Sequence, residues 1–211
     1  MTRAYDAPAR QAQALETRHR IVAAARGLML EGGYARMTIA DLARSAGVSA
    51  QTVYNSVGGK AEVVRAVYDV MLAGDEEPVP MSSRPEFLAV LEAPDVPGWA
   101  AAYAAVARMI QQRVGPLLGV LLAHGPAGDP VLEELVATID AQRRIGNEES
   151  LQGLARRGLL PSRPPRHRLV DAVWVLTAPE VYDRLVRRSG WSAAAYERWL
   201  AAQLRAALAP T

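Results

Sequence analysis

Residues 38–60 read TIADLARSAGVSAQTVYNSVGGK and contain two short helix patterns, one on either side of Gly47. Each pattern covers only about two helical turns, and isolated helices of that length are marginal in water. Both helices must therefore pack against longer neighbours to be stable. This requirement constrains the fold more than any other feature of the chain.

Each short helix has its own start and stop signals. Thr38 is followed three residues later by Asp41, which is a capping-box pattern. Gly47 is placed to end the first helix in the left-handed conformation. Ser49 is placed to cap a second helix that runs to about Asn55. A helix, a tight turn with glycine and a second helix form a helix-turn-helix.

Helical periodicity extends along the rest of the chain, and strand patterns are nearly absent. We interpret residues 1–14 as a loose arm and expect Thr17 to cap a helix that ends at Gly32 and Gly33. Residues 74–83, which combine Gly, Pro and acidic residues, form the expected linker. The remaining helices are expected at Lys60–Leu72 and near 84–92, 96–123, 129–157, 166–187 and 192–208.

The predicted fold is therefore all-α, with a small N-terminal domain over residues 1–73 and a larger helical domain over residues 74–211. The chain has 211 residues and no cysteine, which excludes disulfides and thiolate chemistry. The longest apolar runs are too short to span a bilayer, and the N-terminus does not resemble a secretory signal. We expect a cytoplasmic protein without membrane association.

The second short helix has a polar outer face. If Val53 faces the core, then Gln51, Tyr54 and Asn55 point largely outward. A glutamine can pair with adenine through two hydrogen bonds, and a tyrosine can donate to a phosphate. The pattern fits a helix that reads bases in the major groove. An ordinary solvated surface helix fits it as well.

Lys60 is the only lysine among 24 basic residues, and it begins the next helix, where the helix dipole disfavours a cation. An anion such as a DNA phosphate, approached past Gly58 and Gly59, would explain it. A nucleotide P-loop does not fit, because Tyr54 stands where its first glycine is required and Ala61 replaces the Ser or Thr after the lysine. Residues 1–60 hold eight basic and four acidic residues, which also favours a polyanion partner.

The stretch TIADLARSAGVSAQTVYNSVGGK resembles the DNA-binding signature of the tetracycline-repressor (TetR) family. The resemblance covers roughly residues 17–72, with the threonine cap, the I-A-x-x-A-G-V-S core, the T-V-Y recognition helix and the glycine-lysine start of the fourth helix. Val57 stands where the family usually has an aromatic residue. The stretch from Trp174 to Tyr182 and Gly190-Trp191-Ser192 are also similar to C-terminal regions of some members.

The resemblance implies a homodimeric transcriptional regulator, usually a repressor that a small ligand releases from its double-stranded DNA operator. The N-terminal domain is then a three-helix helix-turn-helix DNA-binding domain, and the C-terminal domain binds the effector and dimerises. The predicted DNA-contacting residues are Thr38, Arg44, Ser49, Ala50, Gln51, Thr52, Tyr54, Asn55 and Lys60.

The helix expected over residues 129–157 changes character along its predicted inner face. Apolar Leu132, Leu135 and Ile139 are followed by Gln142 and Gly146. Small and polar residues on an inner face indicate either a ligand pocket or a wet helix end. The predicted ligand-binding residues, for a mostly hydrophobic ligand, are Trp99, Tyr103, Ile110, Gln142, Gly146, Asn147 and Trp174.

The last two helices carry large apolar residues, including Leu169, Val173, Trp199 and Leu204. They can pair with a second copy of the chain as a four-helix bundle, or pack inside their own domain.

Three histidines, His19, His124 and His167, are too far apart in the sequence to suggest a metal site, and no nucleophile motif is present. We therefore expect no enzyme activity, no metal and no cofactor. A DNA-binding protein whose C-terminal domain only dimerises is the alternative to a ligand-controlled regulator.

Overall fold

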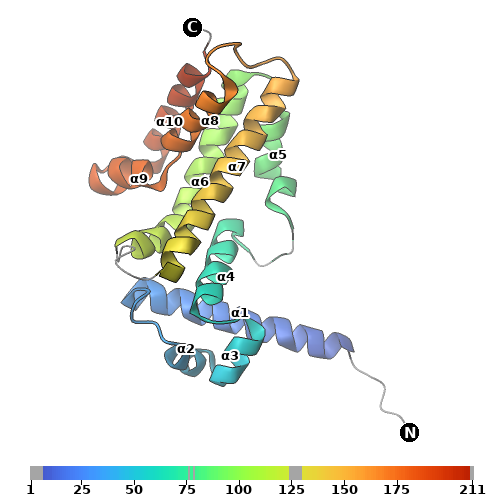
Figure 1. The fold of residues 1–211 in the computed structure, drawn as a ribbon, viewed down its shortest axis with the longest axis vertical. Coiled ribbons are helices and arrows are strands. Elements are labelled where there is room, and N and C mark those ends of the chain that lie inside the picture. The colour runs from blue at the N-terminus through green and yellow to red at the C-terminus, as the bar shows by residue number, and fades with distance from the viewer. Residues whose placement is uncertain (1–6, 76, 78, 124–129, 210–211) are drawn as a thin grey trace. The chain divides into compact units, whose positions relative to one another are not determined.

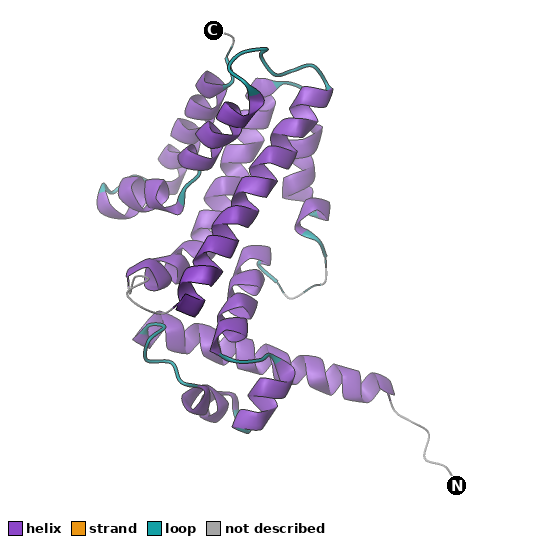
Figure 2. Ribbon diagram, viewed as in Figure 1, coloured by secondary structure: helices purple, strands orange, loops and turns teal. Residues whose placement is uncertain are grey.

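The computed structural model describes residues 7–75, 77, 79–123 and 130–209, and every regular element in this part of the chain is a helix (Figure 1, Figure 2). The all-α prediction is confirmed for these residues. The elements are α1 (Ala7–Gly32), α2 (Ile39–Ala46), α3 (Ala50–Ser56), α4 (Lys60–Ala73), a short 3₁₀ turn (Met81–Ser83), α5 (Pro85–Glu92), α6 (Val96–Ala123), α7 (Pro130–Arg156), α8 (Arg166–Leu176), α9 (Pro179–Tyr182), a π-helical turn (Asp183–Arg188) and α10 (Ala193–Ala207).

The chain forms two compact units. The first combines the residues up to 76 with residues 116–135, and the second combines residues 77–115 with residues 136–211. The division inside α6 falls between Gly115 and Pro116, where the proline removes one backbone donor from the helix. The sequence pattern did not indicate that residues 116–135 group with the N-terminal helices. The limits of the functional domains remain a prediction.

In the first unit, α1 packs against α2, α3 and α4, and α2 packs against α3. This arrangement supplies the longer neighbours that the two short helices need. We predicted that Leu28 and Ile39 would also face inward, and both are half-buried. The other side chains predicted to face inward are buried: Ile21, Val22, Ala25, Met29, Leu42, Ala43, Val53, Val63, Val64, Val67, Tyr68 and Met71.

α1 begins earlier than predicted. Residues 7–14 are helical, so the interpretation of this stretch as a loose arm was wrong, while residues 1–6 lie outside the described part of the chain. The segment is rich in Ala and Gln, which are strong helix formers, and no breaker separates its end from Thr17. It has no apolar face in the core, and the Leu15 side chain is exposed. Its helicity therefore depends on propensity and on continuity with the packed part of α1.

Gly47 ends α2 with a φ angle of 66°, in the left-handed region that favours glycine, and its amide bonds to carbonyls of the last turn. We expect Gly47→Ala to destabilise the first unit by about 1–2 kcal/mol, because a β-carbon disfavours this conformation. Gly27 is a matched control, since it lies inside α1 and an added methyl would meet nothing within 4 Å. Gly27→Ala should stabilise the protein by about 0.5–1 kcal/mol. Urea unfolding of both variants checks that the free energy of unfolding falls in Gly47→Ala and rises in Gly27→Ala. An unchanged free energy of unfolding in Gly47→Ala would contradict the role given to Gly47 in this turn.

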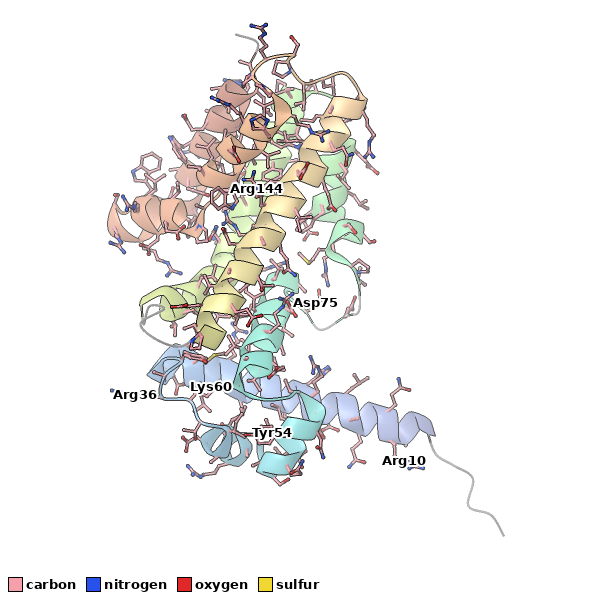
Figure 3. All side chains as sticks on the ribbon, in the orientation of Figure 1. Arg10, Arg36, Tyr54, Lys60, Asp75 and Arg144 are labelled. Carbon is pink, nitrogen blue, oxygen red and sulfur yellow. The ribbon has the colours of Figure 1, made fainter. Side chains whose placement is uncertain are left out.

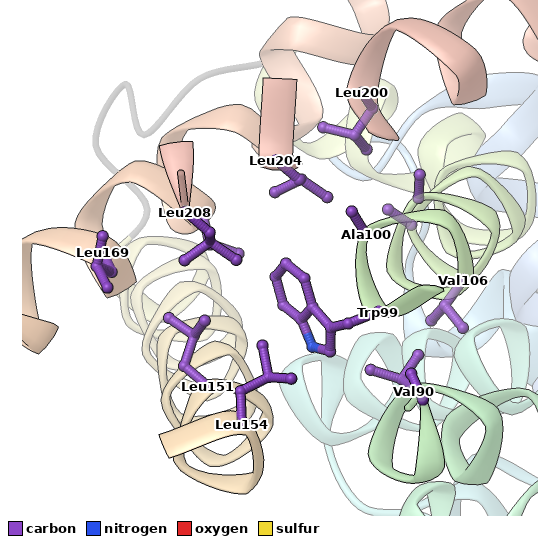
Figure 4. Packing of buried hydrophobic residues seen from close by; sticks show 14 of the residues in the cluster. Val90, Trp99, Ala100, Val106, Leu151, Leu154, Leu169, Leu200, Leu204 and Leu208 are labelled. Atoms are coloured by element: carbon purple, nitrogen blue, oxygen red, sulfur yellow. The ribbon is translucent and has the colours of Figure 1, made fainter. Parts of the chain in front are cut away.

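The second unit has one hydrophobic core built from α5, α6, α7, α8 and α10 (Figure 4). Trp99 from α6 is fully buried and is surrounded by aliphatic side chains such as Leu151, Leu154, Leu200 and Leu204. The core takes in Leu169 and Val173 of α8 as well, so much of the apolar surface that suggested a dimer is used within the chain.

The sequence pattern predicted one helix over residues 166–187. The structure instead has α8, α9 and a π-helical turn in this segment. Ala178 has a ψ angle of 140°, outside the helical region, because the ring of Pro179 disfavours helical geometry in the residue before it. Pro179 was visible in the sequence and marks this break.

Among the described residues, no helix is long and apolar enough to cross a membrane. In the same residues no group of three or more His, Cys, Asp or Glu side chains could hold a metal ion. His124 lies outside the described residues.

Candidate DNA interface

The N-terminus of α3 is held by Ser49. Its hydroxyl accepts a hydrogen bond from the Thr52 amide at 3.0 Å, and the two hydroxyl groups lie 2.8 Å apart. The predicted Ser49 cap is therefore confirmed. Because Val53 of the same helix is fully buried, the cap and this anchor together hold a helix of only seven residues in one orientation.

The N-terminus of α2 has a related arrangement. The Thr38 hydroxyl accepts from the Asp41 amide at 3.1 Å and donates to the Asp41 carboxylate at 2.7 Å. This hydrogen bond from Thr38 lowers the pKa of Asp41, and Arg44, which is 2.9 Å from the same carboxylate, acts in the same direction. The predicted cap is confirmed, but two predicted DNA-contacting residues, Thr38 and Arg44, are engaged with Asp41 in the free chain.

α3 presents a polar outer face. Ala50, Gln51, Tyr54 and Asn55 are exposed and Thr52 is half-buried, as expected from an inward Val53. Tyr54, labelled on α3 in Figure 3, is 53% exposed, which is high for a large aromatic side chain with no core role. The Gln51 side-chain amide donates to the Asn55 side-chain oxygen at 2.9 Å. Asn55 thus orients Gln51, whose amide has a second N–H and an oxygen besides this bond. Contact of Gln51 with a base edge remains a prediction.

Lys60 has partners that the sequence did not reveal. Its ammonium group lies 4.1 Å from the centre of the Tyr34 ring and donates to the Ala35 carbonyl at 3.4 Å. The lysine therefore holds the α1–α2 connection by a cation–π contact. An anion is not needed to explain its position at the start of α4, which Figure 3 shows, and the phosphate contact remains a prediction.

Arg18 is a second residue that sequence reasoning missed. Its guanidinium donates to the Ser56 carbonyl at 3.1 Å, at the C-terminal end of α3. A cation is favourable there because the last carbonyls of a helix carry partial negative charge. Arg18 therefore joins α1 directly to the helix with the polar face.

The second unit brings together three of the predicted ligand-binding residues. The rings of Trp99 and Tyr103 lie 4.9 Å apart on α6. The Trp99 indole N–H donates to the Ser150 hydroxyl at 2.7 Å, and the Tyr103 hydroxyl donates to the Asn147 side-chain oxygen. Burial raises the pKa of Tyr103 above its ordinary value.

Two other predicted ligand-binding residues lie on the exposed face of α7 and not in the core. Gln142 and Gly146 are exposed, so the inner face proposed for this part of α7 was wrong, and a side chain added at Gly146 would meet nothing within 4 Å. The inner face instead runs from Ile139 through Arg143 to Asn147, in steps of four residues.

The last two predicted residues lie near the edge of the core. Ile110 is half-buried against it. The Trp174 indole N–H donates to Asp140 at 3.1 Å, and Arg143 joins both residues, donating to the Asp140 carboxylate at 2.6 Å and to the Trp174 carbonyl at 3.2 Å. Ligand binding by any of the seven residues remains a prediction.

A short capped helix, anchored by one valine and exposing a glutamine, a tyrosine and an asparagine, defines the first unit as a helix-turn-helix DNA-binding module. Residues 21–67 match the family model of bacterial regulatory proteins, tetR family. Residues 21–67 are therefore a DNA-binding domain of the TetR family type.

Solved structures support the fold of the whole chain. The fatty acid degradation regulator FadR from Bacillus halodurans superposes with a TM-score of 0.68 at 14% identity, covering 92% of this chain and 97% of that one. MexZ, a repressor responsible for antibiotic resistance in Pseudomonas aeruginosa, superposes with a TM-score of 0.59 at 22% identity, covering 92% and 95%. None of the curated proteins matches the chain in sequence.

Proposed function

We propose that this protein is a cytoplasmic repressor that binds a palindromic operator as a homodimer and releases it when a small molecule binds the C-terminal domain. The main support for the proposed DNA binding is the exposed face of α3, where the Gln51 side-chain amide donates to Asn55 at 2.9 Å. A glutamine oriented in this way in the first turn of the helix suits a base edge in the major groove.

Each recognition helix covers only one half-site, so the proposed repressor needs two copies. We expect a homodimer whose two α3 helices lie about 34–36 Å apart, one helical turn of DNA. Val175 and Trp191, which are 55% and 37% exposed, remain available for the contact between copies. Light scattering checks the state in solution, and a monomer at micromolar concentration would exclude the proposal.

The alternative is a DNA-binding protein whose C-terminal domain only dimerises. The outward orientation of Gln142 and Gly146 favours it, because the predicted pocket loses two of its lining residues.

Selection of bound duplexes from the genome of the source organism tests the function. We expect enrichment of an inverted repeat, with affinity that falls steeply as salt rises. A Val53→Asp variant is the negative control, because a charge at this buried position removes the support of α3. Binding without sequence preference, or no binding, would contradict the proposal.

A further inference from the structure

The C-terminal end of α3 is held by a residue that lies 38 positions earlier in the chain. The Arg18 guanidinium on α1 donates to the Ser56 carbonyl at 3.1 Å. The last carbonyls of a helix have no amide partner within the helix, so each of them needs another donor. Among the described residues, this is the only hydrogen bond or ion pair that Arg18 makes. Contact with α3 is therefore the one role that the free chain gives to this side chain.

α3 lacks the kind of C-terminal cap that ends α2. Gly47 closes α2 in the left-handed conformation, with a φ angle of 66°, whereas Val57 follows α3 with a φ angle of −129°. The Val57 and Gly58 amides both donate to the Val53 carbonyl, at 2.9 and 3.2 Å. Neither amide serves the Ser56 carbonyl, so a side chain from another helix supplies that donor.

Three contacts hold α3, one near each end and one in the middle. Ser49 caps the N-terminus, the Val53 side chain is fully buried, and Arg18 binds the carbonyl at the C-terminal end. A single buried side chain fixes where a helix lies but leaves the helix able to tilt about that point. α3 has seven residues, so its two ends are about 10 Å apart. Ser49 and Arg18, acting at these ends, oppose the tilt.

Arg18 is attached to a firmly packed part of α1. Ile21 and Val22, three and four residues further along the helix, are 0% and 3% exposed. Residues at these spacings are neighbours on a helix surface, so the base of the Arg18 side chain lies beside the buried face of α1. α1 and α3 are also in contact in the first unit (Figure 1). The hydrogen bond from Arg18 thus joins the end of α3 to the core through α1.

The Ser56 carbonyl follows directly after the residues on the outer face of α3. Asn55 precedes Ser56 and accepts from the Gln51 side-chain amide at 2.9 Å, and Tyr54 is 53% exposed. A tilt of α3 would therefore displace all three outward side chains. Hydrogen bonds to base edges require close geometry, whereas attraction to the phosphates depends mainly on charge.

We propose that Arg18 is a positioning residue for base recognition, which holds α3 at the tilt in which Gln51, Tyr54 and Asn55 reach the operator. This inference rests on the proposed DNA-binding function and adds to it a specificity-determining residue on α1, outside the helix-turn-helix. Arg18 acts through α3 and does not contact the operator itself. Without this hydrogen bond α3 adopts other tilts as well, and the apparent operator affinity falls in proportion to the fraction of molecules that keep the competent one.

Arg18→Met tests this role, because methionine keeps an unbranched apolar side chain and removes the charge and the donors. We expect the operator affinity to fall about tenfold, the factor for one hydrogen bond, and the affinity for a random duplex to change little. Arg26→Met is the matched control, since Arg26 is an exposed arginine of the same helix with no hydrogen bond or ion pair among the described residues. It removes the same charge and should leave the ratio of the two affinities unchanged.

Arg18→Lys should recover most of the operator affinity, because the ammonium group keeps a donor at the end of a long side chain. Equal weakening of both duplexes by Arg18→Met would overturn the proposal. So would a slope of log affinity against log salt concentration that becomes shallower by about one per half-site relative to Arg26→Met, because that is the result for a phosphate contact.

Hydrogen exchange in the free proteins measures the hold on α3 without DNA. In Arg18→Met the amides of residues 53–57 should exchange severalfold faster than in the native chain, while those of α4 keep their rates, which shows that the unit remains folded. Arg26→Met should change neither set, and unchanged exchange at residues 53–57 in Arg18→Met would overturn the proposal.

The two measurements together separate this inference from the proposed function. Faster exchange in Arg18→Met, combined with no operator preference in the native protein, would refute the proposed repressor and support the hold of Arg18 on α3. A native operator preference that Arg18→Met retains in full would refute the role of Arg18 and leave the proposed repressor intact.

Discussion

Trp99→Ala is expected to destabilise the protein by about 3–5 kcal/mol, the range for removing a fully buried large aromatic side chain. Trp99 is 0% exposed and lies among leucines from α7 and α10, so the cavity would be lined by groups from several helices and could not easily close. The substitution would also leave the Ser150 hydroxyl without the indole donor now at 2.7 Å.

Trp191→Ala is the matched control for this measurement. Trp191 is 37% exposed and has an edge-to-face contact with Trp199 at 6.2 Å. Loss of such a pair should cost at most about 1.5 kcal/mol. Urea unfolding followed by circular dichroism gives both values. Equal costs for the two variants would show that the core is not centred on Trp99.

Gln51→Ala is expected to cost about 1–3 kcal/mol of binding free energy on the operator and little on a random duplex, because Gln51 is assigned to a base edge. Lys60→Ala should weaken binding to both duplexes alike, because Lys60 is assigned to a phosphate. The slope of log affinity against log salt concentration should become shallower by about one per half-site. Titrations of both variants on the two duplexes, each at two salt concentrations, separate the roles.

Two controls are needed for this comparison. Gln112→Ala removes an exposed glutamine far from α3 in the sequence and should change neither affinity. The stability of Lys60→Ala must be measured as well, since Lys60 also contacts Tyr34 and Ala35. A change of sequence preference in Lys60→Ala, or an equal loss on both duplexes in Gln51→Ala, would contradict the proposed docking.

The helix-turn-helix could be predicted from the sequence because its signals are local. Thr38, Gly47 and Ser49 each act within one helical turn of their own position, and all three perform the predicted roles. The start of α1 was missed because an exposed helical extension has no apolar period to reveal it.

The buried face of α7 could not be predicted by extending the helical period from the apolar residues at its N-terminal end. After Ile139, a step of three residues leads to Gln142 and a step of four leads to Arg143, and both are polar. Reading backward from Leu151 in steps of four passes through Asn147 and Arg143 to Ile139, which is the face that the structure buries. Among the described residues, the Gln111 Oε1 and the Tyr196 hydroxyl are buried without a hydrogen-bond partner. Their environment depends on contacts between distant helices, so no local pattern predicts it.

In α3, the residues that hold the helix in the fold differ from those on its outer face, and this separation has an evolutionary consequence. Its place in the fold depends on the buried Val53 and the Ser49 cap, whereas Ala50, Gln51, Tyr54 and Asn55 face outward. Substitutions at these four outward positions remove little from the core, so they should cost the fold little. A duplicated copy of the gene could therefore acquire a new target site by changes within a single helical segment, without first having to acquire compensating mutations that restore stability.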